Sequence, residues 1–256
     1  MNTIRQRDVQ GKKSKVFISV VLDESGSMQI GKEAIVSGMN EQIQTLKRKF
    51  NVDLVEPVVS FVKFSDNVHP LYEGKTINDL SEFEPKAYSP NGSTALYDSV
   101  GYTIDMMQKL DGINDEGNSA LLIIITDGEE NASRKFNSSQ IAEKIQSLNK
   151  TGKWTVTYLG PNSVDLTKVN NNTKISYGNM YSADLTSNVG YRKAFASMND
   201  SLGVYASNVS YNVASGLSFA SDSFYVGSKS DSDGSGGSTT SADSLTSDSK
   251  TADKVS

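Results

Sequence analysis

Two short, nearly uninterrupted apolar runs constrain the fold of this chain more than any other feature. They are Val16 to Leu22 and Leu121 to Ile125, and each is followed at once by a polar loop that contains an aspartate. Such runs, rich in β-branched residues and without alternation, are typical of strands that are buried on both faces of a sheet. A sheet of this kind needs helices on both faces, so the two runs predict an α/β domain.

The rest of the chain alternates between helical and strand-like patterns. We expect helices where apolar residues recur every three or four positions, namely at Ile35–Leu46, Leu96–Met107, Ile141–Leu148 and Tyr191–Tyr205. Further strands are expected at Leu54–Phe64, Val68–Tyr72 and Trp154–Leu159, and the turn-forming residues between the first two predict a hairpin. The alternation predicts a doubly wound, mostly parallel central sheet with helices on both faces, as in Rossmann-like folds.

The chain divides into one folded domain and polar ends. Its 256 residues suffice for one sizeable α/β domain. We expect a flexible N-terminal segment at 1–14, the domain at 15–208 and a connecting segment at 209–221. Residues 222–256 consist mainly of Ser, Asp, Gly and Thr, which cannot bury enough apolar surface to fold, so a disordered tail is expected there. The sequence leaves open whether Phe219, Phe224 and Tyr225 dock on the domain or contact a partner.

Composition excludes several classes of function. Without cysteine, the chain has no disulfide, thiolate metal site or cysteine nucleophile. The single histidine, His69, is predicted to end a strand because no second histidine is present to complete a metal cluster. A net charge of -5 supplies no basic surface for nucleic acid, and no apolar stretch reaches the roughly 20 residues that span a membrane. We therefore expect a cytoplasmic protein that binds neither nucleic acid nor membrane.

Three polar loops are expected to meet at one edge of the sheet. Asp23 to Ser27 follows the first buried strand, Gly92 to Thr94 precedes a helix, and Thr126 to Gly128 follows the second buried strand. In open parallel sheets, ligands bind beyond the carboxyl ends of the strands. The loops carry hydroxyl and carboxylate groups, which are hard oxygen ligands suited to Mg²⁺, Mn²⁺ or Ca²⁺. The sequence therefore predicts a site for a divalent cation at this edge.

The three loops resemble the motifs of von Willebrand factor A (VWA) domains. Asp23-Glu24-Ser25-Gly26-Ser27 looks like the family's Asp-x-Ser-x-Ser signature, Gly92 to Asp98 like its second-loop threonine segment, and Ile124 to Gly128 like its third-loop aspartate. The motifs occur in the family's order, and the similarity covers roughly Lys15 to Leu159. The segment Ser187 to Asn208 is similar to the closing helix of bacterial and phage members, which suggests the intracellular type.

The resemblance implies a metal-ion-dependent adhesion site (MIDAS). Ser25 and Ser27 would ligate the cation directly, as would Thr94 in the ligand-competent arrangement, while Asp23 and Asp127 would act mainly through bound waters. Mg²⁺ is the implied cation, with Mn²⁺ or Ca²⁺ as alternatives. A Glu or Asp of a protein partner would complete the coordination. Intracellular members of the family often work beside AAA-type ATPases or in assemblies. The resemblance therefore implies that the partner is an AAA-type ATPase or a component of an assembly.

Other interpretations of the same residues remain open. The serines of the first loop could merely cap the following helix, or the metal site could be structural within a scaffold protein. The segment Gly26 to Lys32 fits the Gly-x-x-x-x-Gly-Lys spacing of a nucleotide-binding loop, although Glu33 stands where that loop needs Ser or Thr.

The remaining acidic residues of the loops are expected to be solvated charges rather than ligands; they are Glu24, Asp98, Glu129 and Glu130. Asp98 is expected to complement the dipole of the helix in which it lies. Hydrolase chemistry needs a Gly-x-Ser-x-Gly elbow or a serine beside a histidine base, and His69 lies away from the serine loops. Asp-x-Asp motifs are also absent from the predicted strand ends. We therefore do not expect an enzyme.

Overall fold

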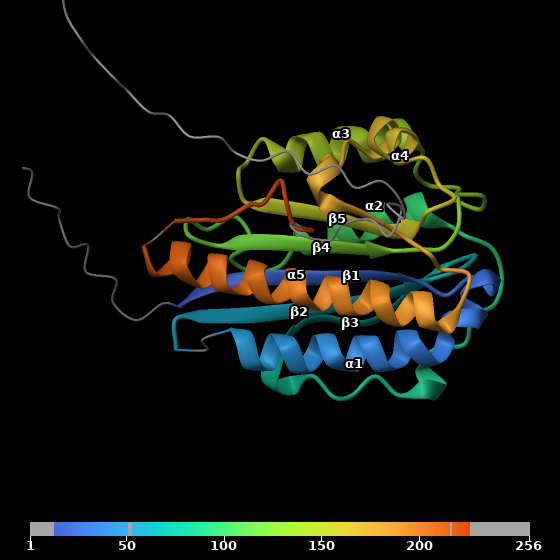
Figure 1. Ribbon diagram of the computed structural model, residues 1–256. Coiled ribbons are helices and arrows are strands. Elements are labelled where there is room, and N and C mark those ends of the chain that lie inside the picture. Colours follow the sequence, from blue (N-terminus) through green and yellow to red (C-terminus); the bar gives the residue numbers. More distant parts are fainter. Residues whose placement is uncertain (1–12, 51–52, 216, 226–256) are drawn as a thin grey trace, which may run out of the picture.

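A six-stranded sheet forms the centre of the protein (Figure 1). The computed structural model describes residues 13–50, 53–215 and 217–225, so most of the predicted N-terminal segment and tail residues 226–256 lie outside it. In sheet order, the strands are β3 (Val68–Thr76), β2 (Val55–Phe64), β1 (Ser14–Asp23), β4 (Ser119–Ile125), β5 (Trp154–Pro161) and β6 (Met180–Ala183). All neighbours are parallel except β2 and β3, which form the expected hairpin. The predicted mostly parallel sheet is confirmed.

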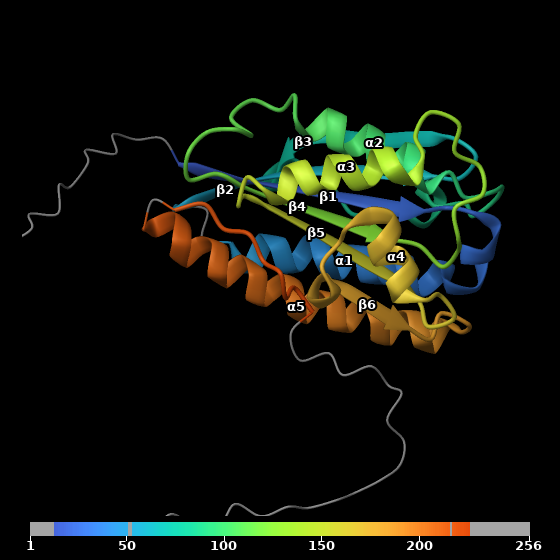
Figure 2. The same ribbon diagram turned by 90° about the horizontal axis from the view of Figure 1, so that it is seen from above.

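Helices cover both faces of the sheet (Figure 1 and Figure 2). One face carries α1 (Lys32–Lys49) and α5 (Asn188–Ala214), and the other carries α2 (Leu96–Met107), α3 (Ser138–Asn149) and α4 (Leu166–Thr173). Short 3-10 helices lie in the connections at Gly26–Gly31, Ile77–Asp79, Pro85–Ala87 and Tyr177–Asn179. Within the part of the chain that the structure describes, no helix has the length and apolar character needed to cross a membrane.

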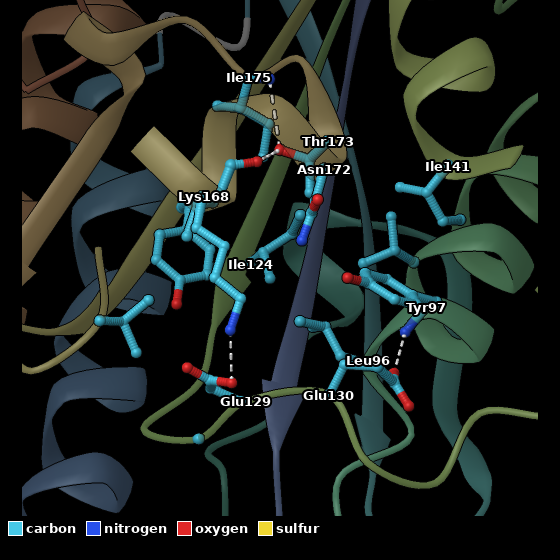
Figure 3. Close-up of a pocket in the computed structure, with 15 residues that line it drawn as sticks. Leu96, Tyr97, Ile124, Glu129, Glu130, Ile141, Lys168, Asn172, Thr173 and Ile175 are labelled. Atoms are coloured by element: carbon cyan, nitrogen blue, oxygen red, sulfur yellow. Dashed lines mark hydrogen bonds and ion pairs between the residues drawn. The ribbon is translucent and has the colours of Figure 1, made fainter. Parts of the chain in front are cut away.

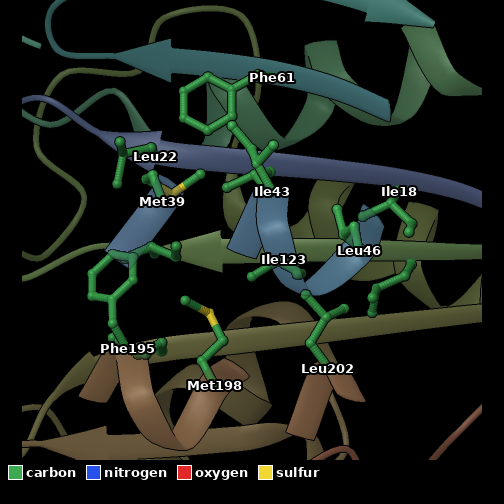
Figure 4. Packing of buried hydrophobic residues seen from close by; sticks show 14 of the residues in the cluster. Ile18, Leu22, Met39, Ile43, Leu46, Phe61, Ile123, Phe195, Met198 and Leu202 are labelled. Atoms are coloured by element: carbon green, nitrogen blue, oxygen red, sulfur yellow. The ribbon is translucent and has the colours of Figure 1, made fainter. Parts of the chain in front are cut away.

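The central strands divide their side chains between two cores. In β1, Ile18 and Leu22 face α1 and α5, whereas Phe17 and Val21 face α2 and α3. The same alternation holds in β4. Because both faces are buried, every position of these strands can be apolar, which explains the runs in the sequence. Figure 4 shows the first core, to which α1 and α5 contribute a row of side chains, including Met39, Ile43, Leu46, Phe195, Met198 and Leu202.

Two elements near the end of the domain are not predicted by the sequence. Helix α4 buries only Thr173, and β6 has four residues at the edge of the sheet. An element that is so short or so polar has too few apolar positions to give a recognisable period. Helix α4 nevertheless matters for the site, because it packs beside α3 and forms one wall of a pocket there.

The folded residues that the structure describes extend beyond the predicted domain boundary. Helix α5 continues past Asn208 to Ala214, and the segment after it returns to the sheet. Phe224 and Tyr225 are buried in the first core, although the sequence analysis assigned them to the tail. Phe224 donates its backbone N–H to Asn179 Oδ1 at 2.8 Å. The aromatic residues therefore dock on the domain. The sequence does not predict this docking, because the residues around them are rich in serine.

Helices α1 and α5 pack so closely that one glycine is required between them. A Cβ added to Gly38 would lie 2.4 Å from the ring of Phe195, whereas a Cβ on Gly203 of α5 would meet only Lys49 Cε at 3.5 Å. Gly38→Ala is therefore expected to lower the free energy of unfolding by about 1–3 kcal/mol through overpacking. Gly203→Ala, the matched control, should raise it by up to about 1 kcal/mol, because alanine favours the helix. Urea unfolding of both variants measures this, and equal effects would contradict the packing argument.

Candidate metal site

The first loop is organised around a buried carboxylate at the end of β1. Asp23 is fully buried, and its Oδ1 accepts a hydrogen bond of 2.7 Å from the backbone N–H of Ser25. Its Oδ2 accepts a bond of 2.6 Å from the hydroxyl of Thr126, which follows β4. Beyond this anchor the loop turns back, so that Ser25 Oγ and Ser27 Oγ lie 3.1 Å apart. The two serine hydroxyls of the Asp-x-Ser-x-Ser pattern therefore converge, as the sequence predicts.

The second and third loops join the first through direct hydrogen bonds. Ser27 Oγ donates to Asp127 Oδ1 at 2.6 Å, and the backbone N–H of Gly26 donates to the carbonyl of Gly92 at 3.1 Å. Thr94 is held by Asn131 through a reciprocal pair, in which its N–H donates to Asn131 Oδ1 at 2.8 Å and its carbonyl accepts from the N–H of Asn131 at 3.1 Å. All three loops thus form one connected unit.

Gly128 leaves space beside the hydroxyl groups. A Cβ at this position would lie 3.4 Å from Thr94 Oγ1 and 4.0 Å from Ser27 Oγ. Because Gly128 has no side chain, the space between Thr94, Ser27 and Asp127 stays open. The structure brings together all five residues that the sequence singles out, namely Asp23, Ser25, Ser27, Thr94 and Asp127.

The spacing of these oxygen atoms fits a small hard cation. Neighbouring ligands of an octahedral Mg²⁺ ion, at a metal–oxygen distance of about 2.1 Å, are about 3 Å apart. The Ser25–Ser27 and Ser27–Asp127 oxygen distances are 3.1 and 2.6 Å. Within the described residues, no group of three or more His, Cys, Asp or Glu side chains could hold a metal. A cation at this edge would therefore depend on hydroxyl oxygens as much as on carboxylates.

The electrostatics of the site are dominated by a buried negative charge. Burial raises the pKa of Asp23 to about 6, and the charge of Asp127 acts in the same direction. The hydrogen bonds from Thr126 and Ser25 oppose this shift. A positive charge among these oxygens would favour the ionised form of Asp23. The site is thus electrostatically suited to a cation and unsuited to an anion.

Glu24 is not a solvated charge, contrary to the prediction from the sequence. Its side chain is buried and forms an ion pair with Lys63, with Nζ and Oε1 2.8 Å apart. The same carboxylate accepts the backbone N–H of Ser89 at 2.6 Å, and the Glu24 carbonyl accepts the N–H of Asn91 at 2.8 Å. Through these hydrogen bonds, Glu24 fixes the second loop against the first. Its charge is paired with Lys63 and does not face the site.

Two further acidic residues are also structural rather than solvated. The carboxylate of Asp98 accepts three backbone hydrogen bonds of 2.8 to 2.9 Å from residues 134–136. Although burial opposes its ionisation, these bonds together hold the pKa of Asp98 below its usual value. Glu130 accepts the backbone N–H of Tyr97 at the start of α2 and that of Ala132. Only Glu129 is exposed, as expected.

Two tyrosines support the site, and the sequence gives no sign of them. The Tyr88 hydroxyl donates to the carbonyl of Asp23 at 2.6 Å. The Tyr191 hydroxyl, from the first turn of α5, donates to Asp127 Oδ2 at 2.7 Å. Both side chains are buried, and in the sequence they look like ordinary core residues. A contact between Tyr191 and Asp127, 64 positions apart, follows only from the way α5 packs.

The segment Gly26 to Lys32 does not have the form of a phosphate-binding loop. It folds as a 3-10 helix, and its N–H groups at Gly26 and Met28 are used by the carbonyls of Gly92 and Ser25. The second glycine of the pattern, Gly31, has a different role, because a Cβ there would lie 2.4 Å from the ring of Tyr191. Two of the backbone donors that could hold a phosphate are thus already used within the protein.

The fold and the site together define a known class of domain. The sequence model of the von Willebrand factor type A domain matches residues 18–199, which is most of the chain. The chain belongs to this family, as the three loops predict. A comparison with curated proteins gave no match.

Solved structures of the same fold are distant in sequence. The von Willebrand factor type A protein from Catenulispora acidiphila aligns with a TM-score of 0.53 and 15% identity, over 75% of this chain and 43% of that one. The vWF domain of the type V pili tip protein Mfa5 from Porphyromonas gingivalis aligns with a TM-score of 0.56 and 11% identity, over 77% and 97%. Proximal thread matrix protein 1 from the mussel byssus, with a zinc-occupied MIDAS motif, gives 0.50 and 16%, over 76% and 46%. This chain thus spans less than half of the first and third structures, and the likeness shows the fold.

Tyr191 is expected to stabilise the third loop through its hydroxyl group. Tyr191→Phe keeps the ring against Gly31 but removes the hydrogen bond to Asp127. Because Asp127 is only partly buried, water can replace the bond in part, and we expect the free energy of unfolding to fall by about 1 kcal/mol. Urea unfolding tests this against Tyr177→Phe, whose side chain is 54% exposed. An equal effect of the two substitutions would argue against a role for the Tyr191 hydroxyl.

Proposed function

We propose that this VWA domain binds a partner protein through a divalent cation held by Asp23, Ser25, Ser27, Thr94 and Asp127. The observation that carries the proposal is the convergence of hydroxyl and carboxylate oxygens from three loops, with Ser27 Oγ 3.1 Å from Ser25 Oγ and 2.6 Å from Asp127 Oδ1. Ser25, Ser27 and Thr94 would hold the cation directly, and the two aspartates would act mainly through water. The cation would supply an electrophilic centre for an acidic ligand.

The proposed partner contributes the carboxylate of a Glu or Asp. Neutral hydroxyl ligands leave most of the charge of a divalent cation uncompensated, so that an acidic side chain is the favoured additional ligand. Mg²⁺ is the proposed occupant, with Mn²⁺ or Ca²⁺ as alternatives, and the zinc in proximal thread matrix protein 1 adds Zn²⁺ to the ions worth testing. We further propose a non-enzymatic, cytoplasmic protein of the bacterial or phage type, acting beside an AAA-type ATPase or in an assembly.

A magnesium titration followed by thermal unfolding tests the cation site. At a concentration one hundred times the dissociation constant, a ligand that binds only the folded state stabilises it by about 2.7 kcal/mol. We expect a magnesium-dependent rise in the melting temperature of the wild type, and a much smaller one for Ser25→Ala and Asp127→Ala. Ser207→Ala, on α5 and away from the site, is the control. The absence of a shift in the wild type would count against a bound cation.

Binding of a partner should depend on the same cation. We expect proteins captured from the native cell by the immobilised chain to be lost on addition of EDTA and regained when MgCl₂ is restored. Asp23→Ala should abolish this capture, because Asp23 anchors the first loop. A scaffold with a purely structural metal site predicts capture that neither EDTA nor Asp23→Ala affects. Nucleotide binding that Lys32→Ala abolishes would instead support the phosphate-loop interpretation.

A further inference from the structure

A pocket lies beside the candidate metal site, on the face of the sheet covered by α2, α3 and α4 (Figure 3). Its volume is about 240 Å³. For comparison, a cavity of about 150 Å³ accepts benzene. The lining combines polar residues with a set of aliphatic side chains from α2, β4, α3 and α4, namely Leu96, Val100, Ile124, Ile141 and Val169. The pocket therefore has the size and the chemistry to hold one large apolar side chain.

The pocket is continuous with the metal edge of the sheet. Gly128 lines the pocket, and a Cβ on the same residue would lie 3.4 Å from Thr94 Oγ1. Leu96 and Tyr97, which also line it, come directly after the second loop that carries Thr94. The two sites thus share one boundary residue and one loop. A segment bound at the metal site would pass the entrance of the pocket.

The entrance is bordered by a weak ion pair. Lys168 Nζ of α4 lies 2.8 Å from Glu129 Oε2 of the third loop, as Figure 3 shows, and the two side chains are 56% and 61% exposed. Ion pairs with this exposure contribute little to stability, so they separate readily when another group approaches. The rim therefore presents a small barrier to an entering side chain.

The wall also offers a buried hydrogen-bond donor in Tyr158. Tyr158 of β5 lines the pocket and is only 3% exposed. Burial raises the pKa of its phenol, and the carboxylates of Asp23, Glu129 and Asp127 act in the same direction. The phenol is therefore protonated at neutral pH and can donate to a carbonyl oxygen of a bound peptide segment.

We propose that this pocket receives an apolar side chain of the partner, two residues away from the acidic residue that completes the metal site. The inference rests on the proposed function and refines it. The partner motif would consist of an acidic residue for the cation and an apolar residue for the pocket. In an extended segment, side chains two residues apart lie on the same face about 7 Å apart, which suits two adjoining sites. The partner would thus present Glu or Asp together with Leu, Ile, Met or Phe.

A phage-displayed library of random heptapeptides tests the motif. Phage would be bound to the full chain in MgCl₂ and eluted with EDTA, and the same selection would be repeated with Val164→Phe and Val204→Phe. Val164 lines the pocket, so phenylalanine there should fill it, whereas Val204 is an exposed residue of α5 and serves as the matched control. A magnesium-dependent thermal shift in both variants verifies that the metal site is intact.

For the wild type and Val204→Phe, we expect peptides with an acidic residue and a large apolar residue two positions away from it. Val164→Phe should still select the acidic residue but lose the apolar preference. In a selected peptide, replacing the apolar residue by serine should weaken binding to the wild type roughly tenfold.

The outcomes separate the two proposals. Selection of acidic peptides without an apolar neighbour, or an apolar preference that Val164→Phe leaves unchanged, would overturn the role of the pocket and leave the proposed function standing. If EDTA released no enriched peptide, or if the enriched peptides lacked an acidic residue, the proposed function and the pocket motif would both be overturned.

Discussion

The carboxylate of Asp23 is the constraint on which the functional edge of this domain depends. It is fully buried at the end of the central strand β1, and its two oxygens bind the backbone of the first loop and the hydroxyl of Thr126 after β4. An unpaired buried carboxylate would be costly, so the chain surrounds it with donors. These donors fix the first and third loops relative to each other, while the ion pair of Glu24 with Lys63 and the hydrogen bonds of Glu24 to residues 89–91 fix the second.

The sequence is sufficient to predict the central part of the fold, for a specific physical reason. Positions such as Phe17 and Ile18 are adjacent in the chain but lie in different cores, and only a strand covered on both sides allows both to be apolar. This continuous apolar pattern is absent from the elements at the edge of the sheet. Helix α4 and strand β6 are short, so their positions depend on packing against α3 and on pairing with β5 rather than on any local pattern.

The candidate site divides in the same way. Its oxygen-bearing residues can be predicted because they lie in three local motifs at the ends of recognisable elements. The residues that support these motifs cannot be predicted, because each acts across a long separation in the chain: Tyr191 reaches Asp127 from α5, and Tyr88 reaches Asp23 from a loop. The pocket belongs to this second group as well, since one of its walls is the unpredicted α4.

The docking of the segment after α5 also determines where the two described ends of the domain lie. Tyr225, the last described residue, donates its backbone N–H to the carbonyl of Gly178, which precedes β6, and the described chain begins near Ser14 at the start of β1. Ser14 lies at the end of β1 that is opposite the three loops, whereas β6 begins opposite Tyr158, near the carboxyl end of β5. The two described ends therefore lie at different levels along the strands, and only the first is remote from the three loops.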